Sequence, residues 1–360
     1  MKIVVILACM SRAGIDFFQS LLDGHSEISQ LPGSFYADEF LKKIKNKTDA
    51  KNIAETFVSM HEHFFDSRLN KLERHDYLGD NKNEYYLINK KEFIENFIDI
   101  IKDQTSDFEK IFISLNLAYS KASGENINHK KLVILHLHHF FRFNAIKNLD
   151  FEIVCTIRDP IASYTSFMKA LAYKNSNYLK YLNSWTFNFH LERTFYHLRN
   201  TSKLKKKTFA IKLEDLHLEN INIMKKFCKN FNLSYENSLQ YSTYHGKKWW
   251  GDSVSRKDLN GVNKNFKNKI NYELFFKKDI SLIEYKLKNY YAKYNYPNRS
   301  PTKISKFFFL LPLKAEFLII IESLKSLKII NFIFCIYYYF KRLLKVFEKE
   351  QEVKNYPNKL

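Results

Sequence analysis

Two arginines stand where an anionic ligand could be bound. Arg12 lies in a short turn after the apolar run 2–8, and Arg158 directly follows a second apolar run, 151–157. Ser166 comes eight residues after Arg158. A guanidinium group pairs well with phosphate oxygens. The turn between a buried strand and a helix also exposes backbone N–H groups that lack partners. This pattern suits a phosphate-bearing ligand, and a strand–turn–helix or a capped helix with a surface arginine would give the same pattern.

Histidines follow a third apolar run, 131–136. His136, His138 and His139 come at its end, and an imidazole near neutral pH can act as a base. Strand-end histidines that only form hydrogen bonds would give the same pattern. His136 and His138 could also bind a metal, but no third ligand is evident in the sequence. We therefore expect no metal.

The sequence around these side chains predicts alternating strands and helices, which would position them. Runs rich in β-branched residues predict buried strands at 2–8, 131–136, 151–157 and 209–213, and helical spacing fills most of the segments between them. Asp159 and Pro160 suit the cap and first position of a helix. We expect an α/β fold, a parallel central sheet flanked by helices, because such an alternation favours parallel strands.

Composition limits the classes of partner. The 360 residues carry a formal net charge of +20, which favours anionic ligands or surfaces. No zinc-finger, RNA-recognition or helix-turn-helix signature is evident, so we expect no nucleic acid. The four cysteines lie far apart and read as reduced thiols. The apolar stretch before Cys9 is too short for a secretion signal, so a cytoplasmic location is expected.

The last sixty residues differ from the rest. Residues 301–347 are very apolar, but their longest run without charge, Ile329 to Phe340, has twelve residues. A spanning helix needs about twenty. We expect a helical C-terminal extension that packs on the domain, forms a homodimer, or lies peripherally on the inner face of an anionic membrane. Residues 348–360 are predicted to be a disordered tail, and residues 1–300 the main domain.

Three short windows resemble one family. Ser11-Arg12-Ala13-Gly14 resembles the 5′-phosphosulfate loop of PAPS-dependent sulfotransferases (PAPS is 3′-phosphoadenosine 5′-phosphosulfate), Arg158 with Ser166 resembles their 3′-phosphate motif, and residues 211–216 resemble a strand-end motif. The resemblance implies a P-loop NTPase-like sulfotransferase fold with PAPS as co-substrate. The chain departs from the family where paired hydroxyls are expected, since Ile15 and Asp16 stand there. Either Asp16 turns away to cap the helix or bind a cation, or cofactor binding differs in detail from that of the family.

The resemblance also implies site residues. The PAPS-binding residues it implies are Ser11, Arg12, Ala13, Gly14, Ile15, Asp16, Arg158, Ser166, Lys247, Lys248, Arg256 and Lys257. The catalytic residues would be Arg12, His138 as the base, and Glu39, which could substitute for a glutamate that many relatives carry after the second strand. Asp38 is an alternative to Glu39.

The implied activity is transfer of a sulfuryl group from PAPS to a hydroxyl or amine. We expect a glycan or lipid-linked sugar as acceptor, because the C-terminal extension suits a membrane surface. Two other functions stay open: a kinase-like or other nucleotide-dependent transferase, and a catalytically inactive, membrane-associated binding protein.

Overall fold

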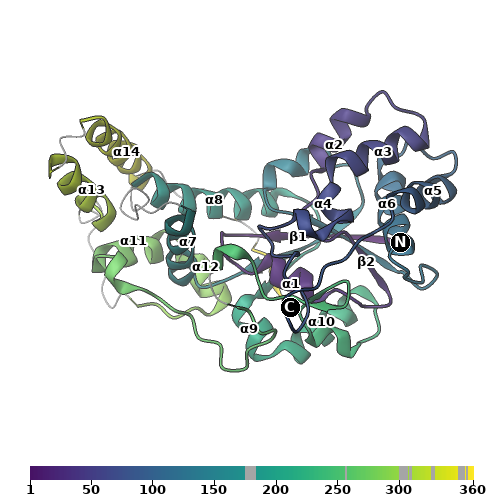
Figure 1. Ribbon diagram of the computed structural model, residues 1–360. Coiled ribbons are helices and arrows are strands. Elements are labelled where there is room, and N and C mark those ends of the chain that lie inside the picture. The colour runs from purple at the N-terminus through teal and green to yellow at the C-terminus, as the bar shows by residue number, and fades with distance from the viewer. Residues whose placement is uncertain are drawn as a thin grey trace.

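A six-stranded parallel sheet forms the centre of the protein in the computed structural model (Figure 1). The structure describes residues 1–174, 184–255, 258–299, 307, 310–325, 329–347, 353 and 356–360. The strand order is β2-β3-β1-β4-β5-β8. The strands are β1 (Lys2–Ala8), β2 (Ile28–Gln30), β3 (Leu132–Leu137), β4 (Phe151–Ile157), β5 (Thr208–Lys212) and β8 (Asn358–Lys359). The predicted parallel α/β sheet is confirmed.

Helices cover both faces of this sheet. In Figure 1, α2 to α6 lie on one side and α9 and α10 on the other. The helices are α1 (Ile15–Leu21), α2 (Ala37–Ile44), α3 (Ala50–Met60), α4 (Glu62–Phe65), α5 (Lys90–Ile101), α6 (Phe108–Ala122), α7 (Pro160–Lys174), α8 (Ser184–Lys203), α9 (Leu213–Leu218), α10 (Asn220–Phe231), α11 (Lys277–Lys286), α12 (Lys288–Tyr294), α13 (Lys314–Lys325) and α14 (Ile329–Phe347). A small hairpin adds β6 (Thr243–Tyr244) and β7 (Lys247–Lys248).

The order of the strands determines where a ligand can bind. From β1 the chain first builds the β3 and β2 side of the sheet and then crosses to β4 and β5. Open α/β sheets bind ligands beyond the carboxyl ends of the strands, at such a reversal. The Arg12 turn, His138 and Arg158 directly follow β1, β3 and β4, so all three lie at that edge.

The C-terminal segment forms two helices, as expected. α13 and α14 lie at one end of the molecule (Figure 1). A buried ion pair joins them, in which Arg342 donates from Nε and Nη2 to the two carboxylate oxygens of Glu316, over 2.7 and 2.9 Å. Among the described residues, no helix is long and apolar enough to cross a membrane.

The predicted disordered tail is wrong for residues 356–360. β8 pairs with β5 at the sheet edge, and the N–H of Leu360 donates to the carbonyl of Ala210 over 3.0 Å. Leu360 is buried, and the Lys359 ammonium pairs with Asp215. The free edge of β5 accepts the segment because its backbone groups would otherwise lack partners. The rest of the tail lies outside the described residues, except for Val353, which is buried.

Candidate active site

The turn after β1 has a backbone that few residues can adopt. Arg12 has a φ of 60° and Gly14 a φ of 81°. This φ at Gly14 strains any residue with a side chain, and a Cβ there would lie 2.4 Å from Cδ1 of Leu213, so the position favours glycine. The side chains of Ala13 and Ile15 are buried. These two residues can therefore face a ligand only through their backbone groups.

The two predicted cationic positions meet at the sheet edge. Nη1 of Arg158 donates to the carbonyl oxygen of Arg12 over 3.1 Å, and Nε of Arg12 lies 3.5 Å from Oγ of Ser166 on α7. Asp159 caps α7 as predicted, since its Oδ1 accepts from the N–H groups of Ile161 and Ala162. The structure thus brings together the windows around residues 12 and 158.

A polar network behind Arg158 sets its direction. Nε of Arg158 donates to Asn268 over 3.2 Å, and Asn268 in turn donates to Glu214 over 2.6 Å. Glu214 also accepts from the N–H of Asp159. Glu214 lies in the third window, to which no chemistry was assigned. Glu214 acts on Arg158 indirectly, because it fixes Asn268, which accepts the hydrogen bond from Arg158.

An acidic residue from a distant segment pairs with Arg12. Asp252 accepts from Nη1 of Arg12 over 3.0 Å and from Nη2 over 3.5 Å. The segment that carries Lys247 and Lys248 therefore reaches the site, but through Asp252. Its two predicted lysines pair elsewhere, Lys247 with Glu84 over 2.8 Å and Lys248 with Asp80 over 3.5 Å. Arg256 and Lys257 lie outside the described residues.

Two further carboxyl groups share the electrostatic environment of Arg12. Burial raises the pKa of Asp16, although the charge of His138 opposes the shift. Burial also raises the pKa of Glu73 well above its ordinary value, and the charges of Asp16 and Asp252 add to the effect. One carboxyl oxygen of Glu73 is buried without a hydrogen-bond partner. Burial and these neighbouring charges thus favour the protonated form of Glu73.

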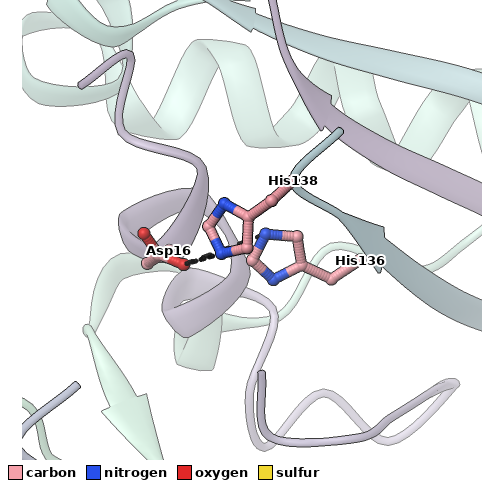
Figure 2. A group of neighbouring side chains, drawn as sticks. All are labelled: Asp16, His136 and His138. Atoms are coloured by element: carbon pink, nitrogen blue, oxygen red, sulfur yellow. Dashed lines mark ion pairs between the residues drawn. The ribbon is translucent and has the colours of Figure 1, made fainter. Parts of the chain in front are cut away.

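His136 and His138 face Asp16 from the end of β3 (Figure 2). Nε2 of each ring lies close to Oδ1 of Asp16, at 3.8 Å for His136 and 3.7 Å for His138. Burial lowers the pKa of both histidines, well below the ordinary value for His136, while Asp16 partly restores that of His138. Both rings are thus held toward the neutral form, which can accept a proton or bind a cation.

Arg193 reaches this group from α8 and has no recognisable signal in the sequence. Its Nη1 donates to Oγ of Ser11 over 3.2 Å and its Nη2 to the carbonyl of His138 over 2.8 Å. Burial lowers its pKa to about 10, so it remains charged at neutral pH. Arg193 therefore ties the β1 turn to the end of β3.

The two remaining acids from the sequence prediction, Glu39 and Asp38, both pair with Arg142. Glu39 on α2 lies 3.2 Å from both terminal nitrogens of Arg142, and Asp38 pairs with the same guanidinium. The charge of Arg142 contributes to the lowered pKa of His138. Glu39 is thus linked to His138 through Arg142, and its catalytic role stays a prediction.

Distant structural likenesses to solved proteins include two sulfotransferase domains. The sulfotransferase domain of the Synechococcus PCC 7002 olefin synthase matches with a TM-score of 0.40 and 10% identity, over 79% of this chain and 94% of that one. The sulfotransferase domain from the curacin biosynthetic pathway matches with a TM-score of 0.39 and 14% identity, over 82% of this chain and 98% of that one. No protein-family model matches the sequence. A search of curated proteins finds no significant match. With TM-scores this low, the function proposed below rests on this chain's own residues.

Proposed function

We propose that the protein is a sulfotransferase that uses PAPS as its sulfuryl donor. The observation that carries the proposal is the meeting of Arg12, Ser166 and Arg158 at the carboxyl edge of the sheet, linked by distances of 3.1 and 3.5 Å. PAPS carries phosphate groups at two positions of its ribose. Two guanidinium groups and a hydroxyl at one edge suit such a ligand better than a single phosphate.

In the proposed reaction, Arg12 stabilises the charge that grows on the leaving 5′-phosphate. The bond between sulfur and that phosphate oxygen breaks, and its electron pair stays on the phosphate. A bond forms between sulfur and the acceptor oxygen. Nε2 of His138 takes the hydroxyl proton, a role that its burial supports by holding the ring neutral.

Two acidic residues near Arg12, Asp252 and Glu73, affect how an anionic donor could bind. Asp252 pairs with the guanidinium of Arg12. An anionic donor has to take its place, so binding of PAPS has to displace Asp252 from Arg12. The raised pKa of Glu73 favours its neutral form, which would add no negative charge against the donor.

Isothermal titration with adenosine 3′,5′-bisphosphate and with ATP tests the donor. We expect the bisphosphate to bind much more tightly, and Arg158→Gln to weaken it. Arg68→Gln removes an exposed arginine that pairs only locally with Asp66, and serves as the charge-matched control. Preference for ATP would instead favour the kinase-like alternative. Transfer of labelled sulfate from PAPS would rule out an inactive binding protein.

For the acceptor, we propose a glycan or lipid-linked sugar at a membrane surface. α14 supports this because its exposed apolar side chains recur every three to four residues and so share one face. They are Ile329, Ile330, Ile333, Phe334, Tyr337, Phe340 and Leu344. Lys341 is also exposed on α14, and the chain as a whole carries +20. Such a helix suits an anionic lipid surface.

Vesicle flotation tests this surface. We expect the protein to float with phosphatidylglycerol vesicles and not with phosphatidylcholine vesicles, and the double variant Ile333→Glu, Phe340→Glu to stay at the bottom. Leu69→Glu, which changes an exposed leucine on another element, is the control. Alternatively, the protein could bind neither kind of vesicle, sediment as a dimer, and become monomeric in the double variant. That result would mean that this face of α14 binds a second copy of the chain.

A further inference from the structure

The group Asp16, His136 and His138 has the composition of a metal site. One donor atom from each residue lies within 4.8 Å of the other two. The residues come from two elements, the first turn of α1 and the end of β3, and Figure 2 shows both imidazole rings directed at the carboxylate. The distances of 3.7 and 3.8 Å to Oδ1 are too long for hydrogen bonds, so the three side chains do not satisfy one another.

His136 supplies an independent observation. Its Nδ1 lies 2.7 Å from Oε1 of Gln19, while Nε2 of Gln19 donates to the carbonyl of Leu31 over 2.7 Å. The amide of Gln19 is thereby oriented with its oxygen toward the ring. Nδ1 of His136 must therefore carry the proton and donate it, which leaves the lone pair on Nε2.

That lone pair points into the group and has no hydrogen-bond partner. The His136 side chain is fully buried, and its Nε2 is an unsatisfied buried atom. An unpaired buried acceptor is costly. Metal-binding histidines usually have one ring nitrogen held by a second residue. His136 has this arrangement, and its other nitrogen faces an acid and a second imidazole.

The spacing fits a small divalent ion. Zinc binds imidazole nitrogen and carboxylate oxygen at about 2.0–2.2 Å, so tetrahedral ligands lie about 3.3 Å apart. The two distances from histidine to carboxylate, 3.8 and 3.7 Å, need to close by about half an ångström, and the two histidine donor atoms lie within 4.8 Å of each other. His138 can move because a third of its side chain is exposed. Two imidazoles and one carboxylate also leave a fourth position open, as in catalytic zinc sites.

The surrounding charges do not prevent a cation from binding. The nearby guanidinium groups of Arg12 and Arg142 are each engaged by acids, Asp252 for the first and Asp38 with Glu39 for the second. Asp252 also adds negative charge close to Asp16. Arg193, which approaches the carbonyl of His138, is the cation that opposes the site.

We propose that Asp16, His136 and His138 bind one divalent transition-metal ion, with zinc as the best fit. The site also accounts for the acid at a position where the sulfotransferase family carries a hydroxyl. Its existence is independent of the proposed transfer reaction. Its effect on that reaction rests on the proposed function: a metal on Nε2 of His138 occupies the lone pair that a base needs, so bound zinc should inhibit transfer.

Titration of the untagged, chelator-treated full chain with Co²⁺ tests the site. We expect one ion per chain, visible absorption bands of tetrahedral cobalt, and displacement of cobalt by zinc. Asp16→Asn and His138→Gln should each weaken binding by about 100-fold or more. Gln19→Ala, which removes the residue orienting His136, should weaken it about 10–100-fold. His129→Gln changes an exposed histidine and should have no effect.

Two results would overturn the proposal. One is the absence of stoichiometric binding in the parent chain. The other is binding that persists unchanged in Asp16→Asn and His138→Gln, which would place the ion elsewhere. Because both readouts measure metal and not turnover, they separate this proposal from the sulfotransferase assignment. A protein that transfers sulfate without binding cobalt would retain the proposed function and lose the metal site.

Discussion

The guanidinium of Arg158 donates a hydrogen bond to the backbone carbonyl of Arg12, 146 positions earlier in the chain. Arg12 has a φ of 60°, a backbone conformation that is costly for a residue with a side chain. The bond from Arg158 helps to hold this conformation and so sets the direction of the Arg12 side chain. The two cationic positions therefore depend on each other.

Replacement of Arg12 tests its role in transfer. We expect Arg12→Ala to lower turnover by about 100-fold or more, because loss of one donor to a developing anion has a cost of this order. The measurement is the rate of labelled-sulfate transfer from PAPS, with Arg68→Ala as the matched control. Turnover equal to that of the parent would remove Arg12 from the mechanism.

Asp252→Asn should strengthen binding of adenosine 3′,5′-bisphosphate by about tenfold. The carboxylate of Asp252 competes with the ligand for Arg12, and a hydrogen bond to a charged group contributes about 1.5–3 kcal/mol. Calorimetric titration measures the change. Asp258→Asn also removes an acid, but one that pairs with Arg74 and Lys82, and should leave affinity unchanged. Weaker binding in Asp252→Asn would mean that this carboxylate assists the ligand.

The base can be identified by comparing two variants. His138→Ala should lower transfer by about 10²–10⁴-fold, the usual contribution of a general base. Glu39→Ala should have the smaller effect, since Glu39 is held by Arg142. Transfer rates should be measured with metal chelated, so that loss of a metal ligand is not mistaken for loss of the base. If neither variant loses rate, both assignments fail.

Acid should destabilise the fold through three buried histidines. Burial lowers the pKa of His61, His75 and His197 to about 3. Because the unfolded chain binds these protons near pH 6.5, their stabilising effect is complete above that pH and is lost as the pH falls toward 3. Between about pH 6.5 and pH 3, each histidine should lower the free energy of unfolding by about 1.4 kcal/mol for every unit by which the pH falls. Urea unfolding at several pH values measures this slope.

His61→Phe gives the matched test of this slope. Neither ring nitrogen of His61 has a hydrogen-bond partner, and the ring stacks on Phe64 with centroids 4.9 Å apart. Phenylalanine keeps the stack and cannot titrate, so the slope should decrease by about 1.4 kcal/mol per pH unit. His129→Phe, at an exposed position, should leave the slope unchanged.

Local patterns in the sequence were sufficient for the sheet and for part of the site. The apolar runs at β1, β3, β4 and β5 predicted those strands, and the Asp159-Pro160 pair predicted the start of α7. These signals are contained within a few residues. The positions of Arg12 and Arg158 at one sheet edge then follow from parallel strands, whose carboxyl ends lie together.

The other site residues arrive from segments without such a signal. Glu73 lies in a polar connection, Arg193 in a helix rich in other polar residues, and Asp252 follows two tryptophans. Their approach to the site depends on how distant segments pack, which no local pattern contains. The strand β8 was missed for the same reason, since two residues carry too little pattern and pair only because β5 offers a free edge.

The buried pair between Arg342 and Glu316 has a consequence for the end of the molecule. Pulling α13 away from α14 would break this buried pair and both of its hydrogen bonds. The two helices should therefore turn together as one body. Whatever surface α14 meets, its exposed apolar side chains will approach it in a single fixed orientation.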